Sequence, residues 1–449
     1  MSSATATTKP NIVFLFADQL HAFGLGCMGN PDVLTPNLDR LASEGVVFEN
    51  TYSNWPVCTP FRGILMTGRY ATATGVTGNA HRLPIGLPTL ADRLGEAGYR
   101  TSYVGKWHLG GKGNEWVPPE LRGGFAEFIG YQCYNDYLDQ VWFFDEDGQK
   151  IVGEGHRTEV TTDLALQRLE GLKRRGEPFA LFVSYQNPHY PVQPSPNCEA
   201  LYRGRSITRR PNTIDVEPYT PTFSPPSPKP PERDPNFQKY GGDLDEYLRL
   251  YYAMVTQLDA NVGRFLRALD QLGLSEETVV IFTSDHGDMQ GSHGKTNKDL
   301  PWEESSRIPL IVRAPGGAAG VRRNELVSAV DFYPTCLDLA GAPPPPLDWS
   351  QGGMSFAPAV WRSDVTLPVR PVFCEGRRWC MIREGPLKLV ASKPDLAPTD
   401  LYDLDKDPYE LVNKVADEGH GLEKERLLQK LRTWYRRVLA DNAMPSELR

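Results

Sequence analysis

The chain has no apolar run long enough to cross a membrane. Its first apolar segment, Ile12–Ala17, covers six residues, whereas a transmembrane helix needs about 20. The first ten residues are small and polar and lack the basic and apolar regions of a signal peptide. We therefore expect no membrane association and a cytoplasmic protein, or a periplasmic or secreted one if a leader was removed.

Cysteine patterns and nucleotide-binding motifs are also missing. The seven cysteines are scattered and odd in number, and no Cys-x-x-Cys spacing occurs, which argues against a disulfide framework or a zinc site of that type. No P-loop, dinucleotide fingerprint or Gly-x-Ser-x-Gly elbow stands out. The net charge of −8 argues against nucleic acid as a partner. It does not exclude a small anionic substrate, since a cationic pocket can lie on an acidic surface.

The apolar runs that are present predict an α/β fold. Residues 11–17, 179–185 and 279–283 are continuous apolar segments, typical of strands buried on both faces of a parallel sheet. They alternate with amphipathic stretches such as 162–174 and 247–273, which are predicted helices. We predict an α/β/α sandwich around a large, mainly parallel sheet.

Proline-rich segments divide the chain. A proline run at 343–346 predicts a boundary between an N-terminal catalytic domain, residues 1–345, and a smaller C-terminal α+β subdomain, residues 346–449. Nine prolines between Pro211 and Pro235 predict that residues 196–240 form a long extended loop.

Polar residues of the types that bind metals and anions or transfer protons follow three of the predicted strands. Asp18 ends the first strand, where open α/β sheets bind ligands; it is a candidate metal ligand, or else a helix N-cap. Strand alternation would place Lys106 and His108 on one side, able to hold an anion and move a proton. His189 follows another strand, in a stiff Asn-Pro-His-Tyr-Pro setting; it is a site residue or a turn histidine.

The central motif is Cys58-Thr59-Pro60-Phe61-Arg62, followed by Leu-Met-Thr-Gly-Arg. A cysteine nucleophile needs a lowered thiol pKa, which Arg62 or a helix N-terminus would supply. The alternative is a small cysteine buried at a strand-to-helix turn.

This Cys-x-Pro-x-Arg pattern resembles the signature of the formylglycine-dependent, type I sulfatases of the alkaline-phosphatase-like superfamily. Further motifs at residues 35–42, 105–110, 187–191 and 284–288 are similar to those of the family and occur in the same order. The resemblance implies that a formylglycine-generating enzyme oxidises Cys58 and that the hydrated aldehyde is the nucleophile. It also implies a small antiparallel sheet and one helix at the C-terminal end.

The resemblance further implies a metal site formed by Asp18, Gln19, residue 58, Asp285 and His286. Sulfatases usually hold Ca²⁺ there, and the nitrogen of His286 also suits Mn²⁺ or Mg²⁺. Gln19 departs from the commoner Asp-Asp pair and is similar to the choline-sulfatase and phosphonate-monoesterase branches.

Catalytic roles carry over by the same resemblance. Arg62 would help the metal to orient a hydroxyl of the hydrate, Lys106 would bind formylglycine or sulfate oxygens, and His108 would act on the second hydroxyl. His189 is implied as a sulfate ligand and proton donor. Lys298, four residues before Trp-Glu-Glu, would bind the sulfate and assist the leaving oxygen.

The predicted function is therefore hydrolysis of a small-molecule or oligosaccharide sulfate ester. Aryl, alkyl and sugar sulfates all remain candidates; a sugar is favoured by the aromatic-rich residues 131–144, which would stack on a ring unless they form a core strand. Asn79 contacts the substrate in this interpretation, or else it has a structural role in a turn. The alternatives are a phosphonate or phosphate esterase on the same scaffold, and a non-catalytic binding protein in which Cys58 stays a thiol.

Overall fold

The computed structural model describes residues 9–111, 113–138, 141–214, 243–342 and 352–440. A large sheet crosses the molecule with the strand order β11-β2-β10-β8-β1-β7-β3-β4-β5-β6, and β9 pairs with β2. Its strands are β1 (Asn11–Asp18), β2 (Val46–Tyr52), β3 (Arg100–Lys106), β4 (Glu127–Tyr131), β5 (Trp142–Phe144), β6 (Lys150–Val152), β7 (Phe179–Pro188), β8 (Thr278–Ser284), β9 (Arg307–Ile308), β10 (Leu310–Arg313) and β11 (Val321–Ser328).

The middle of this sheet is parallel. β1 pairs in parallel with β7 and β8, and β3 with β7 and β4. The two strands flanking this block run antiparallel to both of their neighbours: β10 to β8 and β2, and β5 to β4 and β6. The predicted mainly parallel sheet is confirmed.

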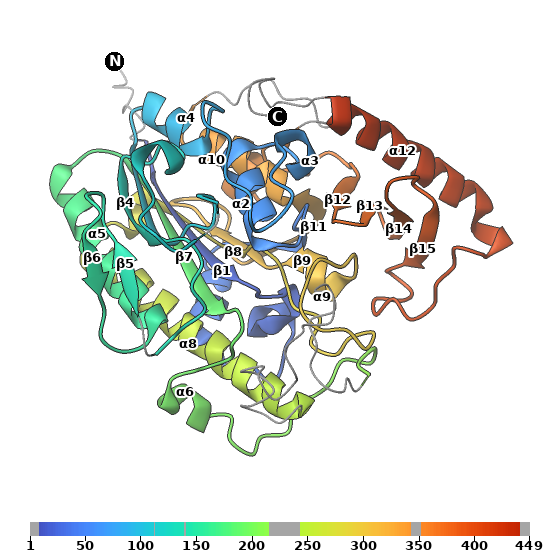
Figure 1. Ribbon diagram of the computed structural model, residues 1–449, viewed down its shortest axis with the longest axis horizontal. Coiled ribbons are helices and arrows are strands. Elements are labelled where there is room, and N and C mark those ends of the chain that lie inside the picture. Colours follow the sequence, from blue (N-terminus) through green and yellow to red (C-terminus); the bar gives the residue numbers. More distant parts are fainter. Residues whose placement is uncertain (1–8, 112, 139–140, 215–242, 343–351, 441–449) are drawn as a thin grey trace.

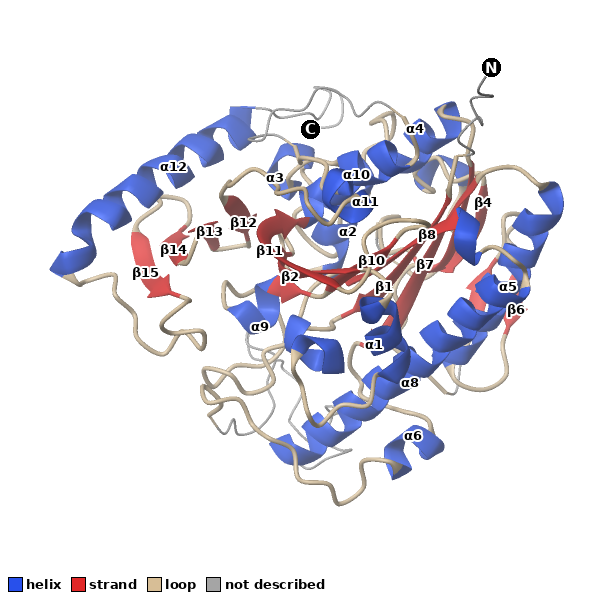
Figure 2. Cartoon of the chain, turned by 180° about the vertical axis from the view of Figure 1, so that it is seen from behind, coloured by secondary structure: helices blue, strands red, loops and turns tan. Residues whose placement is uncertain are grey.

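Helices cover both faces of the sheet (Figure 1, Figure 2). The side chains of β1 alternate between two cores: Phe14 and Phe16 pack with helix α2, while Val13 and Leu15 pack with α1, α5 and α8. This two-sided burial is what the continuous apolar run requires, and it confirms the α/β/α sandwich. The α-helices of this part are α1 (Pro36–Ser43), α2 (Cys58–Thr67), α3 (Ala71–Thr74), α4 (Leu90–Glu96), α5 (Arg157–Arg175), α6 (Pro196–Ala200), α8 (Leu244–Gln271), α9 (Glu303–Ser306), α10 (Phe332–Leu339) and α11 (Ala357–Trp361).

Short 3₁₀ turns punctuate the chain at η1 (Ala22–Gly24), η2 (Gly26–Met28), η3 (Pro119–Leu121), η5 (Ser275–Glu277), η6 (Ala329–Asp331) and η7 (Glu418–His420). Within the part of the chain that is described, no helix combines the length and apolar character that crossing a bilayer demands.

A second, four-stranded sheet forms the C-terminal part: β12 (Val372–Glu375), β13 (Trp379–Glu384), β14 (Leu387–Ser392) and β15 (Pro398–Asp403), all antiparallel. The terminal helix α12 (Gly421–Ala440) packs Leu431 and Trp434 on it. The predicted small antiparallel sheet with one helix is confirmed. The proposed boundary at 345/346 lies outside the described residues, and the core on the α2 face continues without a break into Ile382 and Trp434.

Two other sequence-based expectations need correction. The segment 196–240 is not a loop throughout, because residues 196–200 form α6; residues 215–242 lie outside the described part. The aromatic stretch 131–144 belongs largely to the core, since Tyr131, Tyr137 and Phe143 are fully buried. These three rings are therefore not available for stacking on a sugar.

Buried ion pairs join the two sheets. Lys388 of β14 lies 2.9 Å from Glu303 of α9 and 2.8 Å from Glu410, and all three side chains are almost completely buried. Tyr52 of β2 donates a hydrogen bond of 2.9 Å to Glu303. Burial alone would raise the pKa of Glu303, but the Lys388 ammonium lowers it to about 2. The second sheet is thus attached to the first by charges that have no access to water.

We expect Lys388→Met to lower the free energy of unfolding by about 3–5 kcal/mol, because it removes the cation of the buried Glu410 and the nearest cation of the buried Glu303. Urea denaturation followed by circular dichroism measures the loss. The matched control is Lys406→Met, which removes an ammonium whose side chain is 76% exposed beside Asp403 and should cost far less, because water screens an exposed pair. Equal losses in the two variants would contradict the prediction.

Candidate active site

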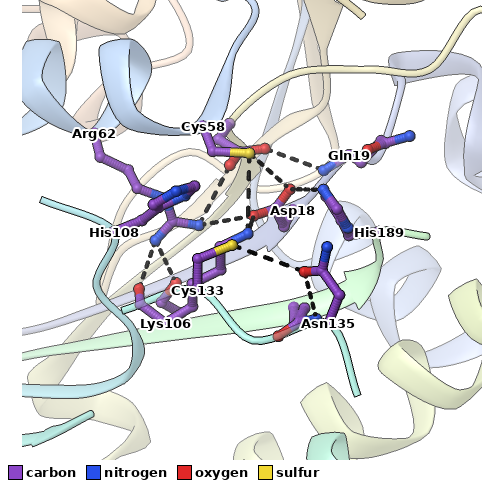
Figure 3. Close-up of polar contacts among 12 residues, drawn as sticks. Asp18, Gln19, Cys58, Arg62, Lys106, His108, Cys133, Asn135 and His189 are labelled. Carbon is purple, nitrogen blue, oxygen red and sulfur yellow. Dashed lines mark hydrogen bonds and ion pairs between the residues drawn. The ribbon is translucent and has the colours of Figure 1, made fainter. Parts of the chain in front are cut away.

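The predicted site residues come together at one edge of the large sheet. β1 ends at Asp18, β3 ends at Lys106, β7 leads into His189 and β8 leads into Asp285. These four strands are neighbours in the order β8-β1-β7-β3. Because their carboxyl ends meet at the same edge, side chains far apart in sequence converge there, opposite the first residue of α2, Cys58 (Figure 3).

Four metal-ligating groups form a buried cluster. The ligand atoms of Asp18, Cys58, Asp285 and His286 all lie within 4.8 Å of one another. His286 Nδ1 lies 3.0 Å from the carbonyl oxygen of Gly287, an acceptor only, so Nδ1 carries the proton. The Nε2 lone pair then faces Cys58 Sγ at 3.2 Å, Asp285 Oδ1 at 3.4 Å and Asp18 Oδ1 at 3.5 Å. Electron-rich atoms converging in this way fit a bound divalent cation.

Arg62 holds the two carboxylates of this cluster in place. Its Nη2 donates to Asp18 Oδ2 at 3.1 Å and to Asp285 Oδ2 at 3.3 Å. Its Nη1 donates to the backbone oxygen of Lys106 at 2.6 Å and to Ser184 Oγ at 2.8 Å. Each carboxylate therefore uses its Oδ2 on the arginine and keeps its Oδ1 for the cluster. Burial and the neighbouring Asp18 raise the pKa of Asp285 to about 6.

Two ammonium groups also lie close to the Cys58 sulfur. Lys298 Nζ lies 3.3 Å and Lys106 Nζ 3.9 Å from Sγ, and Lys106 also pairs with Asp18 at 2.7 Å. Burial would raise the pKa of Cys58, but Lys106, Lys298 and His286 together lower it well below its usual value. Residue 58 is thus placed where negative charge is stabilised.

The position of Lys106 depends on a glycine. At Gly105, where φ is +113°, a Cβ would collide with the backbone oxygen of Ser184 on β7. Only glycine lets β3 approach β7 this closely at the strand end. His108 lies beyond the strand, with φ +58°, so strand alternation was the wrong reason for grouping it with Lys106. It still reaches the site, where its side chain contributes to lowering the pKa of Cys58.

Gln19 connects Lys298 to a further acidic residue. Its Oε1 accepts from Lys298 Nζ at 2.9 Å and its Nε2 donates to Asp288 Oδ2 at 2.8 Å, while its backbone N–H donates to Asp285 Oδ1 at 3.0 Å. Both ends of the amide thus have protein partners, and its role as a metal ligand stays a prediction. Asp288 was not identified from the sequence, although it follows the Asp285-His286 motif directly.

His189 and Asn79 border the cluster. His189 Nδ1 lies 2.5 Å from the Tyr190 backbone oxygen and its Nε2 4.0 Å from Asp18 Oδ1; burial and Lys298 lower the pKa of His189 to about 4. Asn79 is exposed, and its Oδ1 accepts from the backbone N–H of Thr59, the residue after Cys58, at 3.2 Å.

Cys133 is a member of the site that no sequence motif indicated. It lies beside Lys106 and His108 (Figure 3), with Sγ 3.8 Å from Asn135 Oδ1. Burial would raise its pKa, but Lys106 and then His108 lower the pKa of Cys133 to about 7. A lone cysteine in an irregular segment carries no pattern that sequence reasoning could use.

A cation-flanked nucleophile position beside a metal-ligand cluster, at the carboxyl edge of a parallel sheet, defines a metal-assisted hydrolase of oxyanion esters. The sequence model of the sulfatase family matches residues 10–342, and that of the N-sulphoglucosamine sulphohydrolase C-terminal region matches residues 291–437. The chain belongs to the sulfatase family of sulfuric ester hydrolases.

Individual relatives agree with this assignment. The chain is similar to the ulvan-active sulfatase of Formosa agariphila, with 34% identity over 340 residues, which cover 74% of this chain and 62% of that protein. It is 28% identical to the N-acetylglucosamine-6-O-sulfatase of Bacteroides thetaiotaomicron over 95% of this chain and 86% of that protein. Another protein was solved in complex with its substrate, D-glucosamine-2-N,6-O-disulfate. Its structure superimposes on this chain with a TM-score of 0.81 at 26% sequence identity, covering 97% of this chain and 99% of that one.

We predict that the protein binds a divalent cation and that Asp285→Asn weakens this binding. In wild type, added Ca²⁺, Mn²⁺ or Mg²⁺ should raise the thermal midpoint, since a ligand that binds only the folded state stabilises it. The variant should lose most of this shift because it lacks one charged donor. Calorimetry gives the midpoint and elemental analysis gives the bound metal.

The matched control is Asp259→Asn. Asp259 is a buried carboxylate on α8 whose pKa burial also raises to about 6, but it binds the backbone of α1 at 2.8 Å instead of the cluster. It should retain the metal-dependent shift. A shift that survives Asp285→Asn unchanged would show that the ion binds elsewhere.

Proposed function

We propose that the protein hydrolyses a sulfate ester of a carbohydrate, with a formylglycine derived from Cys58 and a divalent cation held by Asp18, residue 58, Asp285 and His286. One observation carries the proposal: the Cys58 sulfur lies among both metal-ligating and ammonium groups, 3.2 Å from His286 Nε2, 3.3 Å from Lys298 Nζ and 3.9 Å from Lys106 Nζ. This is the charge pattern that an oxygen nucleophile and a departing sulfuryl group both need.

Two groups complete this site in the proposal. A formylglycine-generating enzyme supplies the modification of Cys58, and the hydrated aldehyde supplies an oxygen nucleophile. The bound cation supplies Lewis-acid stabilisation of negative oxygen. Ca²⁺ suits the two carboxylates, and the His286 nitrogen also admits Mn²⁺ or Mg²⁺.

Lys106 and Lys298 bind the sulfuryl oxygens in this proposal. Both ammonium groups lie within 4 Å of Sγ, and charge-assisted hydrogen bonds from them would strengthen as charge develops in the transition state. Arg62 does not contact the substrate directly. It is occupied by Asp18 and Asp285 and orients the cluster.

Proton transfers are assigned to His108 and Lys298. His108 accepts a proton from the side chain of residue 58, because its buried imidazole lies close enough to residue 58 for each to shift the pKa of the other. Lys298 donates to the leaving oxygen. His189 is a poorer donor, because its Nδ1 proton points at the Tyr190 carbonyl and its Nε2 is left as an acceptor.

A carbohydrate substrate is proposed from the relatives. Two relatives are named an ulvan-active sulfatase and an N-acetylglucosamine-6-O-sulfatase. A third protein was solved in complex with a sulfated sugar, D-glucosamine-2-N,6-O-disulfate. Their similarity to this chain supports a sulfated sugar over a simple aryl or alkyl sulfate.

The test is turnover of 4-nitrophenyl sulfate beside a matched phenyl phosphonate monoester, with formylglycine content confirmed by intact mass. Wild type should prefer the sulfate, and Cys58→Ala should lose about 10³-fold or more in kcat, the scale of losing a covalent nucleophile. Cys198→Ala, at a half-buried position on α6, is the control and should keep full activity. A phosphonate preference would assign the protein to the alternative activity. If the modified protein does not turn over 4-nitrophenyl sulfate, a panel of sulfated sugars is tested next, and absence of turnover of these as well would refute the proposal.

A second prediction separates the two candidate proton donors. Over a series of aryl sulfates, Lys298→Ala should slow phenols of high pKa by about 10²–10⁴-fold, the usual contribution of a general acid, and 4-nitrophenol much less. His189→Ala should slow all members by a similar factor. Lys295→Ala, three residues away and outside the cluster, serves as the control. If the His189 variant shows the steeper dependence on leaving-group pKa, His189 is the donor.

A further inference from the structure

A groove lies between the nucleophile segment and the C-terminal sheet. It has a volume of about 790 Å³. One wall comes from Trp55 and the loop 77–81, and the other from Arg377 and Lys393 of the second sheet and Tyr435 of α12. The two walls meet where α3 approaches β12 and α12 (Figure 1): the backbone N–H of Thr72 donates to Glu375 at 3.0 Å, and the rings of Tyr70 and Trp434 are 5.0 Å apart.

The groove is lined by cationic side chains. Its lining includes Arg377 and Lys393 and, among the described residues, no aspartate or glutamate, while Glu375 pairs with Lys393 from outside this lining. The chain as a whole carries a net charge of −8. A cationic concavity on an acidic protein concentrates anions at that place.

Lys393 is fixed at the floor of the groove. Its Nζ donates to Glu375 Oε2 at 3.2 Å and to the Gly376 backbone oxygen at 3.1 Å, and it lies 5.0 Å from the Trp55 ring centroid and 5.1 Å from that of Tyr435. The two aromatic rings hold the ammonium by cation–π contacts. A cation held in one place needs little further ordering when an anion binds.

Arg377 stands at the rim. It is exposed, and among the described residues none accepts a hydrogen bond from its guanidinium. Burial raises the pKa of Asp299, the residue after Lys298, to about 6, and the backbone and the positive charge of Arg377 oppose this rise. The planar guanidinium can bind a sulfate or a carboxylate through two hydrogen bonds at once.

Three contacts connect the groove to the catalytic centre. Trp55 precedes Cys58 by three residues. Asn79, in the loop 77–81 of the same wall, accepts from the backbone N–H of Thr59 at 3.2 Å. The backbone N–H of Asp299 donates to Pro56 at 3.1 Å, and the Asp299 carbonyl accepts from the Trp379 indole at 2.9 Å. A substrate bound at residue 58 would therefore have the groove beside it.

We propose that this groove binds a second anionic group of the substrate, a sulfate or carboxylate on a sugar next to the one being desulfated, through Arg377 and Lys393. The protein would then select sugars that are charged at more than one position. The inference rests on the proposed sulfatase function and names the substrate class of that same site.

Binding is measured by titration calorimetry in a Cys58→Ala background, so that the ligand is not consumed. The probes are a heparin-derived tetrasaccharide, its carboxyl-reduced form and D-glucosamine 6-sulfate, which carries a single anion. The tetrasaccharide should bind most tightly. Arg377→Ala should raise its Kd about tenfold, the scale of one lost charged hydrogen-bonding group, and should affect glucosamine 6-sulfate much less. Arg378→Ala, an equally exposed neighbour outside the groove lining, should change either Kd less than twofold.

The outcomes identify the second anionic group or overturn the proposal. If the carboxyl-reduced tetrasaccharide retains both its affinity and its dependence on Arg377, the second group is a sulfate; if it loses them, the group is a carboxylate. A tetrasaccharide that binds no tighter than glucosamine 6-sulfate, or a loss in Arg377→Ala that is equal for both, overturns the proposal. Failure of the sulfatase function itself would appear separately, as absent turnover of both 4-nitrophenyl sulfate and the tetrasaccharide by the formylglycine-bearing wild type.

Discussion

The site depends on one buried cation, the guanidinium of Arg62. Asp18 and Asp285 end two neighbouring strands, and two carboxylates this close and this buried would repel each other strongly. Arg62 lies between their Oδ2 atoms and over the ring of Phe16, with the guanidinium Cζ 5.0 Å from the ring centroid. The same side chain bonds the backbone at Lys106. A single residue of the α2 helix thus fixes three strand ends relative to the nucleophile.

The C-terminal sheet extends the function of the large sheet instead of forming a separate unit. Its core is continuous with the α2 face of the sandwich, and its Lys388 pairs with Glu303 on the other side of the junction. It also brings Trp379 to the backbone of Asp299, next to Lys298. Lys298 is therefore positioned from both sides, and the cationic groove lies at the same junction.

Local patterns in the sequence predicted the layers and most of the site. Continuous apolar strands such as β1 imply burial on both faces, and a polar residue directly after such a strand, such as Asp18, must lie at its carboxyl edge. What the sequence did not predict depends on packing between distant segments. The direction of β10, the amide bridge from Lys298 through Gln19 to Asp288, and the approach of Cys133 to Lys106 all arise only when the sheet has formed. The burial of Tyr131 and Phe143, likewise, is decided by neighbours that no periodicity reveals.

The complete burial of α2 has a consequence for how the protein is made. All ten residues of this helix, Cys58 included, are inaccessible once the sandwich has closed around them. An enzyme that oxidises Cys58 must therefore bind this segment while it is still extended. In the proposed maturation, folding and oxidation therefore compete in time for the same stretch of chain, and a molecule that folds first keeps its thiol for as long as it stays folded.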